Sequence, residues 1–371
     1  MVHPEDILGT IERSCAALVA ASPELVTIDD EALQAAVQAS LGEDAPSAPR
    51  PPARLPLKFD SLEDEINFYA LNHLLDFGFS HDEALQASVG RSSRETVEYG
   101  LMASYLEGRA LNATFIAHLS KEQVHSYFGV DSMVEEEVRP GIRLSKPGPL
   151  SAWVNGLLSC LNGTGRVLLE RRQTSLGALV LSMVEEEAAS AGGAGEPAAA
   201  AVVERLVAAL PGFADAWRPA EPQIVEIDEE ADEPQAPTDV PFLRKAQRLV
   251  RALGLRFGPE DARFRFRGLS ALTLDSGARA VGALLSQGIV RIVDERLRTA
   301  LARRKDLGGS VEEAVLRAAA VEAGRRACRL ALEDKEDATG PARPWPELCL
   351  RAALRAEQRE PTLYAPHSIA Y

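Results

Sequence analysis

The sequence has few of the features that mark secreted, membrane or zinc proteins. Its 371 residues include only four cysteines, which stand singly with no C-x-x-C pair, so neither a disulfide framework nor a zinc site is indicated. The longest apolar runs, such as residues 176–184, are far shorter than the roughly 20 residues needed to cross a bilayer. Residues 1–7 have no basic flank before an apolar core, so we expect no targeting peptide, no membrane partner and a cytoplasmic or nuclear location.

Basic residues are also fewer than acidic ones. The chain has 40 lysines and arginines against 55 acidic residues, a net charge of −15, and eight of the acids lie between Glu221 and Asp239 with no base among them. Nonspecific binding to nucleic acid needs a basic surface that releases counterions from phosphates. The one basic and aromatic block, residues 263–267, is only five residues long. We therefore expect no direct contact with a nucleic-acid polymer.

The short motifs of several enzyme classes are missing. The sequence contains no G-x-x-x-x-G-K-[ST], no G-x-G-x-x-G after a strand and no H-E-x-x-H, which argues against a nucleotide triphosphatase, a dinucleotide-dependent enzyme and a zincin. Its six histidines show no ligand spacing. We expect no metal and no cofactor.

The periodicity of the apolar residues is helical nearly everywhere and predicts an all-α fold of eight to eleven helices in a single domain. Capping-box pairs predict helix starts after Ser61, Ser92, Ser120 and Ser310, and glycines past apolar runs predict helix ends at Gly108, Gly129, Gly163 and Gly288. The only stretch with strand-like alternation is residues 263–267.

Composition also predicts how the chain is divided. Residues 1–41 form a helical segment too short for a core of its own, which we expect to dock on the rest. Residues 42–57 hold five prolines and predict an extended linker. Residues 58–371 form the main helical domain, with exposed loops expected at 189–200 and 218–240.

Three clusters are candidates for chemistry, each with a plainer alternative. Asp76 between Phe77 and Phe79 can grip a flat heterocycle by stacking and a hydrogen bond, or the rings can lie in the core with the acid on the surface. Lys245 lies beside an apolar helical stripe formed by Phe242, Ala246, Leu249, Val250 and Leu253, so its ammonium can meet a phosphate, or Arg244, Lys245, Gln247 and Arg248 can form a solvated face. Asp275 precedes an apolar helical run, where it can act in a site or simply cap the helix.

The order of several segments resembles the queuosine salvage family. The segments that carry the resemblance are residues 26–30, 67–68, 75–79, 162–165, 168–170, 210–215, 242–247, 272–273, 287–289, 366–367 and the terminal Tyr371. Their order and spacing span the chain apart from the proline-rich linker and the acidic loop.

The resemblance implies an all-helical fold similar to helical DNA glycosylases and hydrolysis of the N-glycosidic bond of queuosine 5′-phosphate. The queuine released would be used in tRNA modification, and the partner would be this small nucleotide. On this interpretation Asp275 stabilises the sugar cation and Lys245 holds phosphate or ribose. Asp76, Phe77 and Phe79 line the base pocket, and the other substrate-binding candidates are Glu347 and Arg351.

Three departures from the family pattern favour an alternative. Residues 73–80 replace an acid and a tryptophan of the family segment Asp-Thr-Leu-Asn-Phe-Ser-Phe-Trp. The family's catalytic carboxylate aligns with Gly277, two residues after Asp275. The C-terminal Asp-x-x-x-Leu-Trp segment is altered to residues 347–351, which leaves Glu347 and Arg351 as its polar groups. The alternative is a catalytically inactive paralog that binds a nucleotide or a protein partner.

Overall fold

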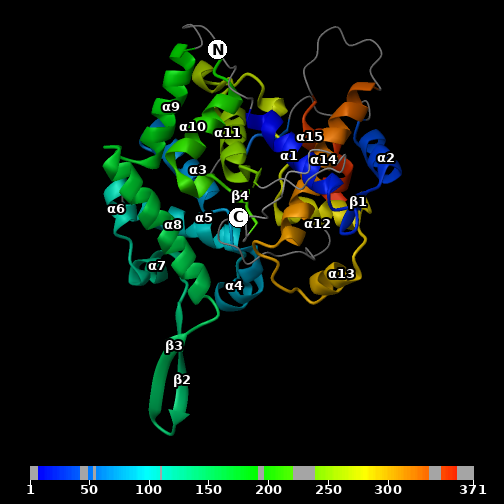
Figure 1. The fold of residues 1–371 in the computed structure, drawn as a ribbon. Helices are drawn as coiled ribbons and strands as arrows, with labels where there is room; N and C mark the ends of the chain where they lie inside the picture. The colour runs from blue at the N-terminus through cyan, green and yellow to red at the C-terminus, as the bar shows by residue number, and fades with distance from the viewer. Residues whose placement is uncertain are drawn as a thin grey trace, which may run out of the picture. The chain divides into compact units, whose positions relative to one another are not determined.

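The computed structural model describes residues 7–41, 49–52, 56–108, 111–190, 196–219, 239–333 and 344–356. The acidic run at 221–239 lies outside the described residues except for Asp239, as do the chain ends and parts of the linker and of the loop at 189–200. The described chain is predominantly helical (Figure 1), so the prediction of an all-α fold is confirmed. Sixteen α-helices are described, more than the eight to eleven expected. No helix of the described residues is long and apolar enough to cross a membrane.

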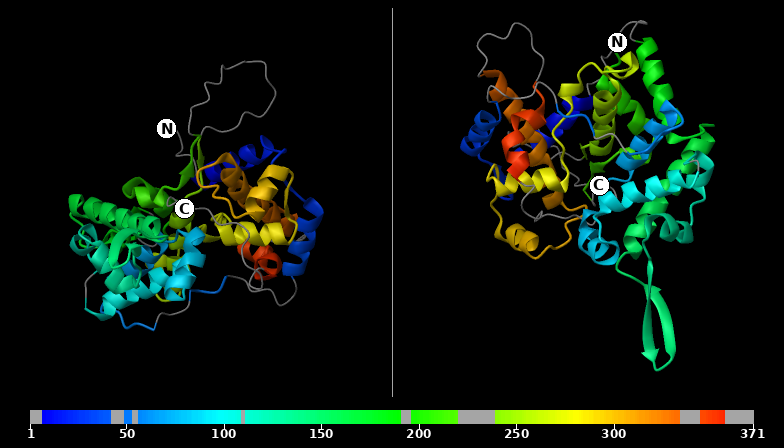
Figure 2. Two further views of the ribbon diagram at one scale, coloured as in Figure 1. Left: turned by 90° about the horizontal axis from the view of Figure 1, so that it is seen from below. Right: turned by 180° about the vertical axis from the view of Figure 1, so that it is seen from behind.

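The chain divides into two compact units, and α10 is shared between them. The first unit comprises residues 1–52, 196–204 and 214–366, and the second comprises residues 53–195, 205–213 and 367–371. Each unit is described by itself below, and Figure 2 gives two further views.

The first unit is built around the long helix α14 (Val311–Glu333). Helices α1, α2, α12 and α15 pack on it. Leu8, Ile11, Cys15 and Leu18 are buried at helical spacing along α1, and the many alanines of α14 let this stripe approach closely. The helices and strands of this unit, with α10, are α1 (Ile7–Ala20), β1 (Val26–Ile28), α2 (Asp30–Ser40), α10 (Ala199–Ala209), β4 (Ala216–Trp217), β5 (Val240–Pro241), α11 (Arg244–Phe257), α12 (Ala278–Ser286), β6 (Val290–Ile292), α13 (Glu295–Ala302), α14, α15 (Pro346–Cys349) and α16 (Arg351–Ala356).

The second unit is a set of helix pairs from which a β-hairpin extends. Helix α3 packs on α9, α5 on α7, and α6 on α8, while β2 and β3 form the hairpin. The elements are α3 (Leu62–Leu74), α4 (Asp82–Val89), α5 (Ser93–Leu106), α6 (Ala113–Ala117), α7 (Lys121–Phe128), β2 (Met133–Arg139), β3 (Ile142–Pro147), α8 (Ser151–Glu170) and α9 (Leu176–Ser190).

Short 3-10 turns join several of these elements. They are η1 (Phe79–His81), η2 (Pro211–Phe213), η3 (Ala262–Phe264) and η4 (Leu269–Ala271). The strand expected at residues 263–267 is therefore wrong, because its first residues form η3 and only Arg267 makes an isolated bridge, to Ala198. The strands that do occur form three antiparallel pairs, β1–β6, β2–β3 and β4–β5.

The helix-start signals agree closely with the structure. Ser92 and Ser120 form complete capping boxes with Glu95 and Gln123, and Ser61 accepts a hydrogen bond from the amide of Asp64. Gly129 ends α7 in the left-handed conformation. Gly163, however, lies inside α8 rather than at its end, since the apolar pattern continues through it.

Candidate functional site

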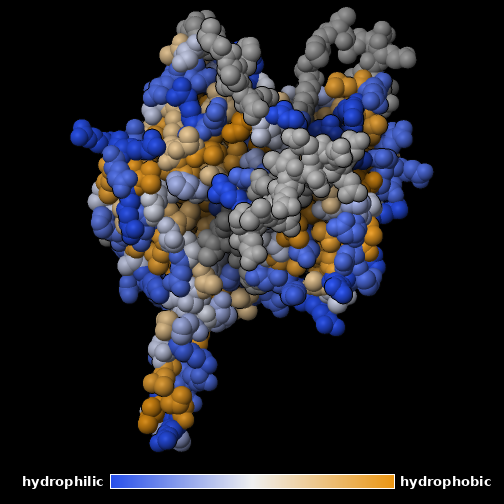
Figure 3. All heavy atoms as spheres, in the orientation of Figure 1, coloured by the Kyte–Doolittle hydropathy of each residue, from blue (hydrophilic) through white to orange (hydrophobic). Residues whose placement is uncertain are grey.

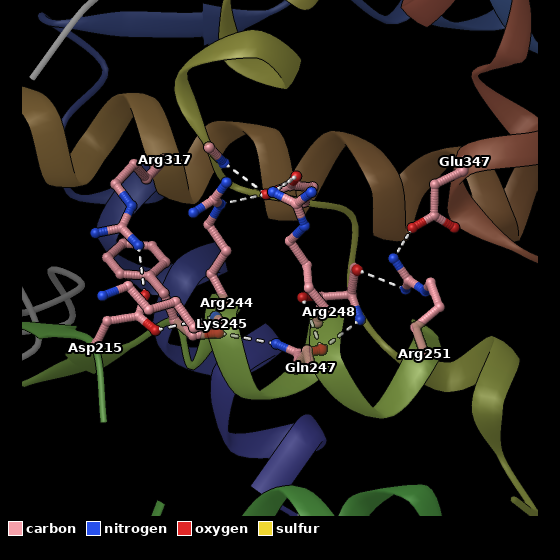
Figure 4. A network of polar contacts seen from close by, with 12 residues as sticks. Asp215, Arg244, Lys245, Gln247, Arg248, Arg251, Arg317 and Glu347 are labelled. Carbon is pink, nitrogen blue, oxygen red and sulfur yellow. Dashed lines mark hydrogen bonds and ion pairs between the residues drawn. The ribbon is translucent and has the colours of Figure 1, made fainter. Parts of the chain in front are cut away.

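The candidate site of the first unit is a network of charged side chains along α11 (Figure 4). Arg244, Lys245 and Gln247 are only 5%, 2% and 3% exposed. The interpretation of this side of the helix as a solvated face is therefore wrong for these three residues. The apolar stripe that begins at Phe242 is buried as predicted. The helix thus buries charge as well as apolar surface, which requires partners for the charged groups.

The chain enters α11 through a strained turn. Leu243 has φ of 49°, a left-handed conformation that costs a non-glycine residue roughly 1–2 kcal/mol. The amides of Phe242 and Leu243 both donate to the carbonyl oxygen of Asp215 at 3.0 Å, and the amide of Lys245 donates to Asp215 Oδ1 at 3.4 Å. Asp215 therefore holds the turn in place and puts a negative charge beside the helix start, where the dipole favours one.

Asp215 is also half of a buried ion pair. Arg317 of α14 donates to Asp215 Oδ2 at 2.7 Å, and both side chains are at most 3% exposed. The Arg317 guanidinium lies 3.9 Å from the centroid of the Phe242 ring, a cation–π arrangement. Helix α14 thereby anchors the residues that precede α11.

The segment 272–277 is bound to α11 by side chains one turn apart. Gln247 donates to the carbonyl oxygen of Phe242 at 2.8 Å and accepts from the amide of Thr273 at 2.8 Å. Arg251 donates to the carbonyl oxygens of Leu272 and Thr273 at 3.2 and 3.1 Å. Positions 247 and 251 share a helix face, so together they fix the segment that carries Asp275.

Asp275 is held from both sides by arginines. Arg244 Nε donates to Asp275 Oδ1 at 2.6 Å, and Arg248 Nη1 lies 3.4 Å from Oδ2. Oδ1 also accepts from the amide of Gly277 at 2.9 Å. Asp275 does not cap α12, because the N-cap is Gly277, which has no side-chain cap. The side chains of Arg248 and Asp275 are 19% and 28% exposed, so they are the more accessible part of the network.

Gly277 leaves room for the Arg244 guanidinium. A Cβ at position 277 would lie 2.6 Å from Arg244 Nε and 2.9 Å from Cζ, closer than these atoms can approach. The position that the resemblance assigns to a catalytic carboxylate therefore lies directly against an arginine that is paired with Asp275.

Glu347 of α15 forms the other end of the network. It pairs with Arg251, and burial raises the pKa of its carboxyl more than Arg251 lowers it, with a further rise from nearby Asp275. Glu347 Oε2 and Arg251 Nε are both buried and have no hydrogen-bond partner among the described residues. The network thus contains one carboxylate shared by two arginines, Asp275, and one carboxyl of raised pKa, Glu347, in addition to the buried pair of Asp215 and Arg317.

The remaining predicted site residues lie elsewhere. Arg351 begins α16 and makes no hydrogen bond or ion pair with this network among the described residues. Asp76, Phe77 and Phe79 belong to the second unit. Asp76 is buried beside the buried Phe77 rather than on the surface, so the plainer interpretation of this cluster is wrong for the acid.

The turn that carries Asp76 and Phe77 is fixed by neighbours in the second unit. Trp153 donates from Nε1 to the Ser93 hydroxyl at 2.9 Å, and Ser93 donates to the carbonyl oxygen of Phe77 at 2.7 Å. Gly78 has φ of 80° and lies so close to the Trp153 indole that a Cβ would meet it at 2.7 Å. The base-binding role of this turn stays a prediction.

Sequence reasoning missed Asp215, Arg251 and Arg317 as members of the network. Asp215 stood in a segment used for the resemblance but had no assigned role. The available signal was Arg317 within an apolar, alanine-rich stretch of the sequence, because an arginine is rarely buried without a partner. Comparison of the chain with protein-family models and with curated proteins finds no match.

Proposed function

We propose that the first unit binds a nucleoside 5′-monophosphate of the queuosine type at the start of α11 and does not hydrolyse it. The proposal is the inactive alternative of the sequence analysis. The observation that carries it is the state of Asp275, whose two oxygens are engaged by Arg244, Arg248 and the Gly277 amide.

A carboxylate in this state is poorly suited to hydrolysis. Two guanidinium groups offset its charge, so it offers little electrostatic stabilisation to a sugar that develops positive charge in the transition state. Both of its oxygens already interact with donors, from Arg244, Arg248 and the Gly277 amide, which weakens it as a base toward water. Gly277 supplies no second carboxylate, and the space beside it is filled by Arg244.

The same residues support binding of an anion. The first two turns of α11 contain Arg244, Lys245 and Arg248 and no acidic residue in the first turn. The positive end of the helix dipole adds to these charges. A phosphate that approaches the exposed part of Arg248 can share that guanidinium with Asp275, because arginine offers several donors in one plane.

Hydrolysis of queuosine 5′-phosphate with release of queuine is the second candidate. It is favoured by a second carboxyl in the network, Glu347, whose pKa is raised by burial and further by the charge of Asp275. Glycoside cleavage ordinarily uses two acids, one that donates a proton to the leaving group and one that stabilises the sugar. On this candidate the freed base serves tRNA modification.

Isothermal titration calorimetry with queuosine 5′-phosphate and with queuosine tests the binding proposal. We expect the phosphorylated compound to bind at least tenfold more tightly, and Arg248→Ala to remove most of that difference. The matched control is Arg256→Ala on the same helix, which removes an arginine that pairs with Glu260 instead. Equal affinities for the two compounds, or equal effects of the two substitutions, would contradict the proposal.

A further inference from the structure

The β2–β3 hairpin of the second unit exposes an apolar face. Every residue of both strands is exposed, and the hairpin extends away from α7 and α8 (Figure 1, and the right-hand view of Figure 2). Large apolar side chains on it appear as an orange patch in Figure 3. The most exposed of them are Leu144 at 57%, Ile142 at 52% and Val138 at 49%.

The strand register sorts the side chains onto two faces. Val134 pairs with Lys146, and Glu136 pairs with Leu144. Paired residues share a face and alternate residues lie on the same side, so Val134, Ile142 and Leu144 occupy one face with Glu136 and Lys146. The Lys146 ammonium lies 2.5 Å from the Glu136 carboxylate, which agrees with this assignment. Ile142 pairs with Arg139, which therefore also lies on this face, and Val138 is the extra residue of the bulge between Glu137 and Arg139.

The opposite face of the hairpin is mostly polar, with the apolar pair Met133 and Pro147 at its base. Glu135 pairs with Ser145, and Glu137 pairs with Arg143. The Arg143 guanidinium lies 3.3 Å from the Glu135 carboxylate. A ribbon with one apolar and one polar face is the pattern of a sheet that covers a core, yet the apolar face is exposed in the described chain. A two-stranded ribbon on its own is only marginally stable in water.

From this arrangement we infer that the apolar face of the hairpin docks onto the same face of a second copy of this chain. The proposed interface consists of Val134, Val138, Ile142 and Leu144, flanked by the charged residues Glu136, Arg139 and Lys146. A two-fold axis along the ribbon lays β2 of one copy over β3 of the other, so that Glu136 faces Leu144 of the second copy and lies diagonally across from its Lys146. The contact is isologous, since each copy uses the same residues.

Charge favours a second copy over other occupants. The chain as a whole has a net charge of −15, so most of its surface repels its own copies. The hairpin strands contain three glutamates and three basic residues and are neutral, which removes that repulsion at this place. A neutral ribbon has no surplus of positive charge with which to attract nucleic acid or an anionic lipid surface.

The size of the face sets the expected strength of the dimer. The strands have seven and six residues, and only one face of them takes part, whereas a standard interface uses roughly 20–30 residues a side. We therefore expect a weak dimer that forms in the micromolar range. Apolar contact at the tip supplies most of the affinity, and the charged pairs set the orientation.

Sedimentation velocity of the full chain from low to high micromolar concentration tests the inference. The wild-type chain should shift from monomer to dimer as its concentration rises. Leu144→Lys should weaken the dimer roughly tenfold or more, because it places a charge in the apolar centre. Ser145→Lys adds the same charge at the next position on the polar face and should leave the dimer unchanged, while circular dichroism checks that both variants fold alike.

A charge exchange tests the orientation separately. Glu136→Lys and Lys146→Glu should each form a weaker dimer alone, and an equimolar mixture of the two variants should recover the dimer, because each charge then meets its opposite in the other copy. A chain that stays monomeric at every concentration would overturn the inference and point to a different occupant of the face. A dimer that tolerates Leu144→Lys, that is weakened as much by Ser145→Lys, or that is not recovered in the mixture would also overturn it.

Discussion

In most proteins apolar side chains are buried and charged ones are exposed. Helix α11 and the β2–β3 hairpin depart from this pattern in opposite directions. Helix α11 buries Arg244 and Lys245, while the hairpin exposes Ile142 and Leu144. The buried charges sit in a network that Asp215, Asp275 and Glu347 share. The apolar residues of the hairpin stay exposed in the described chain. The buried charges of α11 therefore point to partners within the chain, whereas the exposed apolar side chains of the hairpin point to a partner outside it.

Removing the acid at the start of α11 should have the largest effect. Asp215→Ala leaves Arg317 buried without its ion-pair partner and removes an acceptor for the Lys245 amide, so we expect the first unit to lose about 3–5 kcal/mol of stability. Urea unfolding checks this value. Asp239→Ala removes an acid that pairs with Arg218 on the surface and should cost less than about 1 kcal/mol. Similar losses for both variants would show that the buried pair is not needed.

A methyl group at Gly277 should have the next largest effect. Gly277 has an ordinary extended backbone, so Gly277→Ala strains no dihedral angle and acts only by pushing on Arg244. We expect a loss of about 1–2 kcal/mol and weaker nucleotide binding. Gly163→Ala, inside α8 with no atom within 4 Å of the added carbon, should instead stabilise by about 0.5–1 kcal/mol. Thermal unfolding of both variants measures the two changes in stability. A loss in both variants, or a gain in both, would contradict the account.

Two glutamates of the first unit, Glu347 and Glu322, should give opposite dependences on pH. Burial raises the pKa of Glu347 above its ordinary 4.5, so its contribution to stability is full below 4.5 and is lost as pH rises through the folded-state value. For Glu322 burial acts the same way, but hydrogen bonds from Arg325 and Arg326 prevail and lower its pKa. Its contribution is therefore lost as pH falls through the folded-state value.

Stability measured as a function of pH separates these two contributions. Glu347→Gln should flatten the decline toward higher pH, and Glu322→Gln should flatten the decline toward acid. If Glu347→Gln changed the decline toward acid instead, or Glu322→Gln the decline toward higher pH, the environment of that glutamate would be wrongly assigned.

A charge on the hairpin should have the smallest effect on folding. Leu144 is largely exposed, so Leu144→Lys should change the free energy of unfolding of the monomer by less than about 0.5 kcal/mol. Chemical unfolding at a concentration where the chain is monomeric measures this value. A loss of 2 kcal/mol or more would mean that the hairpin packs within its own chain, in contrast to the exposure that distinguishes it from α11.

Local signals in the sequence predicted much of the helical structure. The capping boxes at Ser92 and Ser120 depend on side chains three residues apart, which a sequence shows directly. The hairpin was missed because its turn, at Pro140 and Gly141, joins strands whose alternation is masked by three consecutive glutamates. The pairing of β1 with β6 joins residues such as Val26 and Ile292, whose separation no local pattern reveals.

The network of α11 was only partly predictable for the same reason. The apolar stripe and the candidates Lys245, Asp275 and Glu347 were found from local patterns and from the resemblance. Whether a charged face is buried depends on what covers it, and the covering groups come from Asp215, Arg317 and the segment 272–277, which are distant in sequence. The arginine at 244 therefore looked like a surface residue.

The most direct test of the central claim is to incubate the purified chain with queuosine 5′-phosphate and follow free queuine by mass spectrometry. We predict that the nucleotide binds and is recovered intact, because Asp275 is engaged by Arg244 and Arg248 and no carboxylate stands at position 277. Release of queuine by the wild-type chain, lost in Asp275→Ala, would contradict this account and identify the protein as a hydrolase.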